Sequence, residues 1–436
     1  MNPSVPDQAR LAIAFVRPDS PDDDRLQATL NRFHFRRLRL VSPARSSRWQ
    51  LVLDRHGELT TVNEEGAAVP LSRRYWPEAR AWLAPYVEAD GPIKNLFPTR
   101  DPRMPGLDQL ADALETELIT RFQLSSRPAS ASFGVVMSHD VDGVGHYWRA
   151  HFKSGAIFLA NALRTATQGG ISRYCLYHGW RFLTGQVRYH GFDHILTRAD
   201  TLGFRPTFFF YARLPDRNKL TRFQHLYGFN PNYDLESPYM RAVLRKLVEG
   251  GARIGLHGSY ASANDPELLA REWRQLQRVI GQPVHCTRQH YLNFEGRATL
   301  RMYQDLGLTI DSTCGYTFAN GFLCGTTRPF YGCLPVAGKP AVVVVPMAFM
   351  DAIPLYYRPT LPEQIFEQEL RPLLEQIRQY GGMASFNLHQ RMFGVFPGFR
   401  ELYEEIAWKI RAMNGHLVSF QDIDTFYPDS EFHHER

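Results

Sequence analysis

The sequence lacks the marks of several protein classes. It has no apolar run near the ~18 residues that a transmembrane helix needs, so no membrane span is expected. Met1–Arg10 does not have the charged-then-apolar layout of a secretory signal. The 5 cysteines include no Cys-x-x-Cys pair, which argues against a structural zinc knuckle and a disulfide framework. We therefore expect reduced thiols in a cytoplasmic protein.

A concentrated block of positive charge is also missing. The formal net charge is +6, but Lys and Arg are scattered and form no run. Because nucleic-acid-binding surfaces are built from clustered basic residues, no nucleic-acid partner is expected. The 436 residues exceed what one hydrophobic core usually fills, so we expect two domains or one large decorated domain.

The first third of the chain differs from the remainder. Short β-like runs occur at Leu11–Val16 and Trp49–Asp54, and Ser125–Ser132 has the Ser, Pro and Ala content of a linker. We place a domain boundary near residue 130. Residues 1–130 are expected to form a small accessory α/β domain for assembly or substrate presentation, and 131–436 the catalytic domain.

Beyond the boundary, apolar strands alternate with amphipathic helices. The clearest helix follows Pro238, with its apolar residues on one face and Gly250-Gly251 at its end. Such alternation predicts a parallel sheet, either open or closed into a barrel. The strands are expected at Gly134–Met137, Pro206–Tyr211, Ala252–Leu256, Val284–Gln289, Leu308–Ile310, Ala341–Val345, Met383–Leu388 and Leu417–Phe420.

Polar side chains follow nearly every one of these strands. The carboxyl ends of parallel strands lie at the same edge of a sheet, where active residues gather. Burying charged groups there is costly unless they are paired. A set of them at this edge therefore predicts a functional site. The candidates are Asp140, Asp142, His257, Arg288, His290, Tyr291, Asp311 and His389.

The chemistry of these groups suits a metal-dependent hydrolase. Asp140 and Asp142 are two residues apart, so on an extended backbone both carboxylates point to the same side and repel unless a cation lies between them. Carboxylates and imidazoles without thiolates suit zinc, iron, manganese or cobalt, of which we prefer zinc. Such a metal lowers the pKa of bound water to about 7. A carboxylate can then accept the proton, and an imidazole can protonate a leaving nitrogen.

Five segments carry a resemblance to a known family. Ser138–Asp142, Gly255–Tyr260, Arg288–Tyr291, Asp311–Thr313 and Asn387–His389 occur in the order of the five motifs of the polysaccharide deacetylase (NodB-homology, carbohydrate esterase) family. The chain resembles most its cytoplasmic branch, in which this domain follows a separate N-terminal region. The resemblance covers the chain from about residue 131 onward and implies an α/β fold, a distorted (β/α) barrel.

The resemblance implies roles for the first three motifs. Asp140 matches the general base, and Asp142 matches a metal-binding carboxylate, although Val141 separates a pair that is usually contiguous. His257 matches the first metal-binding histidine. Arg288 matches the arginine that keeps the catalytic aspartate ionised.

Three further residues receive roles in the same way. Tyr291 matches the residue whose backbone N–H stabilises the oxyanion. Asp311 matches the aspartate that tunes the general acid, and His389 matches the acid itself.

One position departs from the pattern. The second metal-binding histidine should lie four residues after His257, where this chain has Ala261. Our hypothesis is that His290, from the next strand end, supplies the missing imidazole. The alternatives are a two-ligand site or no metal site.

These observations lead to one preferred function and two rivals. The preferred function is N-deacetylation of an N-acetylated sugar or glycan in polysaccharide or glycoconjugate biosynthesis. The first rival is a hydrolase of cyclic or small-molecule amides on the same fold. The second is a catalytically silent glycan-binding relative, motivated by Ala261.

Two segments have no counterpart among the motifs. Gly321–Phe330 is rich in glycine and is expected to form a loop over the site, with Arg328 either binding a substrate anion or solvated. Gly143–His190 is aromatic and basic and longer than a simple connection. It is open whether this segment is a lid, a weak contact with a membrane surface or a packed cap, which we prefer.

Overall fold

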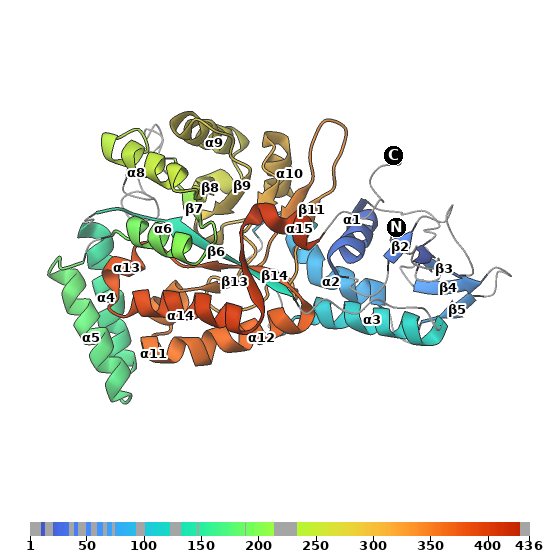
Figure 1. The fold of residues 1–436 in the computed structure, drawn as a ribbon, viewed down its shortest axis with the longest axis horizontal. Coiled ribbons are helices and arrows are strands. Elements are labelled where there is room, and N and C mark those ends of the chain that lie inside the picture. Colours follow the sequence, from blue (N-terminus) through green and yellow to red (C-terminus); the bar gives the residue numbers. More distant parts are fainter. Residues whose placement is uncertain are drawn as a thin grey trace.

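The computed structural model describes most of the chain, and its arrangement is shown in Figure 1. The expected boundary near residue 130 and all of the expected linker except Ser132 lie outside the described residues. The described residues are 10–13, 21–34, 39–41, 49–53, 59–63, 68–71, 75–92, 101–122, 132–145, 148–187, 189–212 and 233–427.

The central element is a curled sheet in which nearly all described strands run parallel. Its order is β11-β12-β10-β9-β8-β7-β6-β14-β13, with β15 also paired to β6, and β11 is antiparallel to β12. The strands are β6 (Phe133–Val141), β7 (Thr207–Phe210), β8 (Arg253–Gly258), β9 (Cys286–Gln289), β10 (Ile310–Asp311), β11 (Phe330–Cys333), β12 (Val342–Val344), β13 (Met347–Met350), β14 (Met383–Asn387) and β15 (Gly415–Val418).

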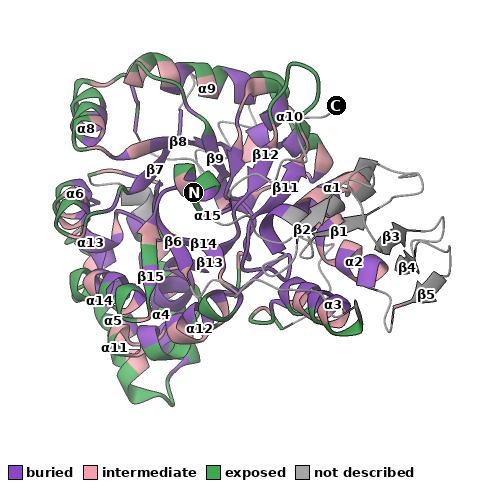
Figure 2. Cartoon of the chain, turned by 45° about the vertical axis from the view of Figure 1, so that its right-hand side comes forward, coloured by how far each residue is buried: buried purple, intermediate pink, exposed green. Residues whose placement is uncertain are grey.

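One bent strand closes this sheet. β12 pairs with β10, and β13 pairs with β14. Val345 and Pro346 alone separate β12 from β13, so the chain passes directly from one side of the sheet to the other. The strands of the resulting ring consist largely of buried residues (Figure 2). The predicted α/β fold with a distorted (β/α) barrel is confirmed.

Local sequence signals set the helices between the strands. α8 (Pro238–Glu249) begins after Ser237, whose hydroxyl accepts a hydrogen bond from the N–H of Met240. α9 (Pro266–Ile280) begins after the equivalent cap Asp265 and ends at Gly281, whose φ of 72° is a left-handed conformation that glycine adopts without strain. Each of these helices leads from one barrel strand to the next and covers the outside of the barrel.

The other helices complete this outer layer. None of the helices in the described ranges combines the length and the apolar composition needed to cross a bilayer. Besides α8 and α9, the described helices that follow β6 are α4 (Trp148–Arg164), α5 (Gly169–Leu183), α6 (Phe192–Thr201), α10 (Arg297–Leu306), α11 (Pro362–Ile365), α12 (Arg371–Tyr380), α13 (Met392–Val395), α14 (Phe399–Ala412) and α15 (Ile423–Phe426). The shorter helical turns are η5 (Tyr260–Ala263), η6 (His290–Leu292), η7 (Ile353–Tyr357), η8 (Phe366–Leu370) and η9 (Phe420–Asp422).

The N-terminal region contributes a second, smaller sheet and three helices. The sheet has the order β2-β1-β3-β4-β5, and the described parts of the predicted strands Leu11–Val16 and Trp49–Asp54 are β1 and β3. The elements are β1 (Arg10–Ile13), α1 (Pro21–Thr29), η2 (Leu30–His34), β2 (Arg39–Val41), β3 (Trp49–Leu53), β4 (Leu59–Asn63), β5 (Ala68–Pro70), α2 (Tyr75–Val87) and α3 (Gly106–Phe122).

These N-terminal helices share the hydrophobic core of the barrel. Leu26 of α1, Leu83 of α2 and Leu110 of α3 belong to one continuous cluster with barrel residues such as Val135 and Phe386. Figure 1 shows the N-terminal elements at one end of the barrel, with α4 and α5 at the other. The N-terminal helices therefore stabilise the barrel by packing against the end at which they lie.

A buried group of polar residues joins α3 and η2 to the amino-terminal ends of the barrel strands. We call it the basal cluster. The Asp108 carboxylate accepts hydrogen bonds from the Thr326 hydroxyl at 2.8 Å and from both the N–H and the hydroxyl of Thr327 at 2.7 Å. His34 Nε2 lies 3.0 Å from the Thr326 oxygen, and Arg328 donates to the carbonyls of His34 and Tyr380. The cluster consists of His34, Asp108, Thr326, Thr327 and Arg328.

The position of Arg328 corrects a prediction. Gly321–Phe330 was expected over the site, but the N–H of Met383, the first residue of β14, donates to the carbonyl of Thr327 at the opposite end of the barrel. Arg328 is completely buried, so it neither binds a substrate anion nor is solvated. Arg328 lies in a glycine-rich segment that was compatible with a surface loop. The prediction failed because the N-terminal segment that binds Arg328 is distant in sequence.

Candidate active site

The carboxyl ends of the barrel strands bring the predicted residues together. Asp140 is the penultimate residue of β6, and His257 is the penultimate residue of β8. His290 directly follows β9, and His389 is the second residue after β14. We call this group, with Asp142, Arg288 and Arg391, the apical cluster. All of these side chains except those of Asp142 and Arg391 are buried.

Asp140 is held by two donors. Arg288 Nη1 donates to Asp140 Oδ1 at 2.8 Å, and Asn387 Nδ2 donates to Oδ2 at 2.7 Å. Burial alone would raise the pKa of Asp140, but the nearby Arg288 guanidinium and the imidazoles of His257 and His389 outweigh it, so the pKa lies below its usual value. Asp140 is therefore a carboxylate at neutral pH.

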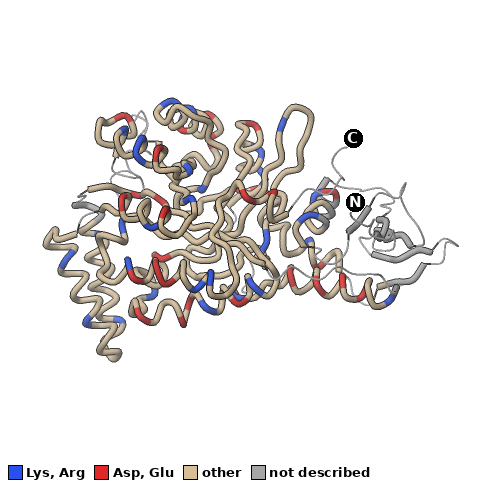
Figure 3. The backbone as a smooth tube through the Cα atoms, viewed as in Figure 1, with Lys and Arg blue, Asp and Glu red and all other residues tan. Residues whose placement is uncertain are grey.

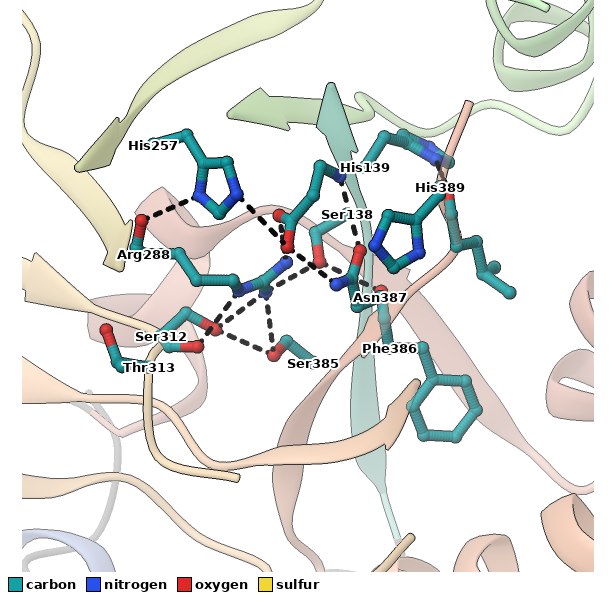
Figure 4. A network of polar contacts seen from close by, with 12 residues as sticks. Ser138, His139, His257, Arg288, Ser312, Thr313, Ser385, Phe386, Asn387 and His389 are labelled. Carbon is teal, nitrogen blue, oxygen red and sulfur yellow. Dashed lines mark hydrogen bonds and ion pairs between the residues drawn. The ribbon is translucent and has the colours of Figure 1, made fainter. Parts of the chain in front are cut away.

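Arg288 is itself locked in place from several strands. Its Nη2 donates to the hydroxyls of Ser138 at 2.8 Å and Ser312 at 2.9 Å, and its Nε donates to the carbonyl of Ser312. Figure 4 shows the guanidinium between Ser138, Ser312 and Ser385. The Phe209 ring lies 4.5 Å from the guanidinium carbon and closes the site from below. The guanidinium is therefore held in one position, from which it donates to Asp140.

Three side chains place their ligand atoms close enough together to hold a metal ion. The ligand atoms of Asp142, His257 and His290 lie within 4.8 Å of one another. Asp142 Oδ1 is 3.4 Å from His257 Nε2 and 3.7 Å from His290 Nε2. Asp142 Oδ1, His257 Nε2 and His290 Nδ1 are buried atoms without a hydrogen-bond partner among the described residues. Buried polar atoms are almost always bonded, so this orphaned group fits a cation.

The hydrogen bonding of His257 and the protonation state of His290 suit metal binding. His257 Nδ1 lies 2.8 Å from the carbonyl of Arg288, to which it donates, and this leaves Nε2 facing Asp142. Burial lowers the pKa of His290 to about 3, so His290 is neutral, the form that binds metals. The turn after His257 supplies no further imidazole, because Ala261 occupies the expected place in η5 and the Ser262 hydroxyl donates to the carbonyl of Ser259.

The second oxygen of Asp142 contacts two residues that follow β14. Oδ2 lies 3.4 Å from His389 Nε2, and Arg391 Nη1 donates to it. Burial would raise the pKa of Asp142, but Arg391 and His389 hold it well below its usual value. The sequence analysis missed Arg391. It lies two residues beyond His389, but nothing in its neighbours separates it from a surface arginine.

His389 is oriented by a carboxylate that differs from the expected one. Its Nδ1 lies 2.5 Å from Asp351 Oδ1, and its backbone N–H donates to Asp351 Oδ2 at 2.7 Å. The hydrogen bonds of Asp311, the aspartate expected to tune this acid, go instead to Tyr86 and Thr313. Asp351 follows β13 directly and obeys the same strand-end rule as the other residues. Pro346 interrupts the apolar run before β13, and this hid the strand from the sequence analysis.

Asp311 lies beneath the site and binds the N-terminal region. Tyr86 of α2 donates to Asp311 Oδ2 at 2.6 Å, and the N–H and hydroxyl of Thr313 donate to Oδ1 at 2.9 and 2.5 Å. Burial raises the pKa of Asp311 to about 6 despite these hydrogen bonds. Its hydrogen bonds therefore join the end of β10 to α2, and its carboxylate lies within the electrostatic reach of Arg288.

Tyr291 lies beside His290 in an unusual backbone conformation. Its φ is 56° and that of Leu292 is 51°, both in the left-handed region. Such conformations cost about 1–3 kcal/mol each for residues with a side chain and cluster at functional sites. The Tyr291 ring stacks on His290 with 4.5 Å between centroids. The left-handed turn at Tyr291 and Leu292 therefore lies next to the apical cluster and sets the course of the backbone after His290.

The chain resembles known proteins at the level of structure. No family model matches the chain, and no curated protein matches it. A putative polysaccharide deacetylase from Mycobacterium smegmatis has a TM-score of 0.43 and 18% identity, over 69% of this chain and 92% of that chain. A probable polysaccharide deacetylase from Pseudomonas aeruginosa PAO1 has a TM-score of 0.44 and 15% identity, over 68% and 91%. Puue allantoinase has a TM-score of 0.45 and 14% identity, over 68% and 90%.

Proposed function

We propose that the protein is a metal-dependent amide hydrolase and that it removes the acetyl group from an N-acetylated sugar or glycan. The observation that carries this proposal is the orphaned group of Asp142, His257 and His290 directly beside an ionised Asp140. A silent binding protein has no use for buried polar atoms without partners, whereas a hydrolase needs an ion, a base and an acid in one place.

The residues present fit a divalent metal, with zinc preferred. Asp142 and His257 would hold it together with His290, which replaces the histidine absent at Ala261. Two imidazoles and one carboxylate form a ligand set of the catalytic zinc type. Such an ion supplies polarisation of the amide carbonyl and acidification of water.

Asp140 acts as the general base in this proposal. It is ionised, its two oxygens are fixed by Arg288 and Asn387, and Oδ2 lies 3.9 Å from His257 Nε2, at the edge of the ligand group. Water bound between these residues can give its proton to Asp140. A positioned base is typically worth about 10²–10⁴-fold in rate.

His389 acts as the general acid. Its Nδ1 contacts Asp351, which fixes the ring so that Nε2 faces Asp142 across 3.4 Å. The imidazolium can protonate the leaving amine, and Asp351 stabilises that charged form. The Tyr291 backbone N–H is proposed to stabilise the oxyanion, a contribution of about 3 kcal/mol for a typical donor.

The first test is metal content by elemental analysis of the purified chain. After incubation with zinc, the native protein should hold about one equivalent, and His290→Ala and His257→Ala should lose most of it because each removes a ligand. His285→Ala is the matched control, because His285 is exposed just before β9 and belongs to no ligand group.

The outcome decides between the proposed functions. Metal lost in both ligand variants and kept in His285→Ala supports the hydrolase, and acetate release from N-acetylglucosamine oligomers then tests the substrate. Metal kept in His290→Ala would refute its role as the replacement ligand. A native protein that stays empty would favour a silent glycan-binding protein. Metal binding with turnover of cyclic amides alone would favour the small-molecule hydrolase.

A further inference from the structure

The hairpin of α4 and α5 exposes an apolar face. On α4, Phe152, Leu159 and Leu163 are spaced by seven and four residues, so they lie along one side of the helix. On α5, the exposed side chains of Leu176, Trp180 and Leu183 are spaced by four and three residues. Leu163 is 81% exposed and Trp180 is 54% exposed. The exposed apolar face consists of Phe152, Leu159, Leu163, Leu176, Trp180 and Leu183.

The two helical stripes join into one surface at two glycines. A Cβ on Gly155 of α4 would lie 2.8 Å from the Leu183 side chain, and one on Gly179 of α5 would lie 3.1 Å from that of Leu159. Leu183 and Leu159 therefore lie across the line where the helices meet. The apolar side chains of the two helices form a continuous patch, of a kind that marks an interaction site when it is large.

The opposite side of the hairpin is packed onto the barrel. Phe158 of α4 contacts the rings of Phe182, Tyr356 and Phe396. Asn161 Nδ2 donates to the carbonyl of Tyr356 at 2.6 Å. These contacts bury the inner face of the hairpin against the barrel. The six exposed apolar side chains lie on the other face and take no part in this packing.

The charge carried by the hairpin itself has one sign. Between Asp142 and Asp193 the sequence contains no Asp or Glu. Figure 3 shows blue and no red along α4 and α5. The basic residues of this stretch are Arg149, Lys153, Arg164, Arg173, Arg181 and Arg188.

We propose that this hairpin binds the surface of a membrane rich in anionic phospholipids, with its apolar face inserted at the boundary between headgroups and acyl chains. An apolar face containing Trp, Phe and Leu beside basic and no acidic residues is the composition of an interfacial helix. A second copy of the chain fits this surface poorly, because two such faces would bring like charges together without a countercharge.

The hairpin also adjoins the mouth of the apical cluster. Lys153 Nζ donates to the Tyr291 hydroxyl at 3.4 Å and lies 5.8 Å from the centre of its ring. Tyr291 stacks on His290. A bound membrane would therefore hold the site close to its surface. That the substrate is a glycan carried by a membrane lipid rests on the proposed function, whereas the binding to membranes does not.

Sedimentation of the full chain with vesicles tests this inference. We expect binding to vesicles of phosphatidylcholine with phosphatidylglycerol, and much weaker binding to phosphatidylcholine alone. The double variant Leu163→Ser/Trp180→Ser should lose at least ~10-fold in affinity, because it removes exposed apolar contacts. Arg173→Glu should lose roughly 5-fold or more, on the anionic vesicles only. Trp408→Ser is the matched control, because Trp408 is 63% exposed on α14 and should leave binding unchanged.

Two further measurements keep the result unambiguous. Thermal unfolding of each variant checks that the fold is retained, and the metal-free protein should bind vesicles as the native protein does. Equal binding by Leu163→Ser/Trp180→Ser and by the native chain would overturn the inference. So would the absence of binding to anionic vesicles, and a dimer in solution that Leu163→Ser/Trp180→Ser dissociates would assign the face to self-association instead. None of these outcomes affects the proposed hydrolysis.

Discussion

The two buried charged groups of the barrel lie at its opposite ends and differ in how fully they are bonded. In the basal cluster, every side-chain nitrogen and oxygen of His34, Asp108 and Arg328 has a partner within the described residues. In the apical cluster, atoms of Asp142, His257 and His290 have none. Burial and charge are therefore shared by both groups and do not by themselves identify a site.

The carboxylates of the two groups show the same contrast. Burial would raise the pKa of Asp108, but His34, Arg328 and Thr327 lower it below its usual value through bonds that belong to the folded chain alone. The corresponding lowering of the pKa of Asp142 depends on Arg391 and His389, which leave its Oδ1 without a partner. A complete set of partners fits a structural role, whereas unpartnered atoms on three side chains of metal-ligand type fit a missing cation.

The largest expected effect is on turnover. Asp140→Asn should lower kcat by about 10²–10⁴-fold, because asparagine cannot accept the proton. The amide oxygen can still accept from Arg288, but the buried guanidinium loses its counter-charge, so a stability loss of about 3–5 kcal/mol is also expected. Acetate release and urea unfolding measure the two effects. Asp108→Asn is the control, which should reduce stability and leave the kcat of the folded fraction unchanged. Equal turnover of Asp140→Asn and the native chain would remove Asp140 as the base.

The next effect is on stability. Arg328→Met should reduce the free energy of unfolding by about 3–5 kcal/mol, because it leaves the Asp108 carboxylate buried without its counter-charge. The carbonyls of Tyr380 and His34 also lose their donor. Urea unfolding measures this loss. A loss below about 1 kcal/mol would mean that the basal cluster does not stabilise the junction between α3 and the barrel.

The smallest effect concerns pH. The pKa of Asp311 is about 6 in the folded protein and 3.8 in its reference state, so the folded chain binds more protons between these values. Stability from this group is fully present below the unfolded pKa and is lost as pH rises through the folded pKa. Compared with Asp311→Asn, the native chain should lose on the order of 1–3 kcal/mol between about pH 4 and pH 7.

Unfolding of both proteins at several pH values measures this difference. Asp108 has a lowered pKa, so its contribution has the opposite sign and is lost as pH falls. Asp108→Asn should therefore remove stability near neutral pH and none in acid. If the native chain and Asp311→Asn respond identically to pH, Asp311 is ionised in the folded state and the Tyr86 contact does not protect its proton.

Local patterns were sufficient to find most of the apical cluster. Asp140, His257, His290 and His389 follow apolar strands, and the periodicity of those strands is visible over a few residues. Arg288 was expected beside Asp140, and the structure places it there. Asp351 obeys the same rule but was missed, because Pro346 divides one bent strand into two short apolar runs.

The assignments that failed all concern partners far apart in the chain. Asp311 was expected to tune the general acid, yet it accepts a hydrogen bond from Tyr86, 225 residues away in the N-terminal region. Arg328 was expected near the site, yet it binds His34, 294 residues away. No pattern near Tyr86 or His34 signals these contacts.

The sequence by itself determined which side chains end the barrel strands, because strand ends follow from the local alternation of apolar and turn-forming residues. The tertiary structure decided which carboxylate each histidine and arginine meets. It also decided which buried atoms are left without partners. Both depend on how distant segments pack around the barrel, and hydrogen-bond geometry is settled over about 3 Å, a scale that residue spacing does not encode.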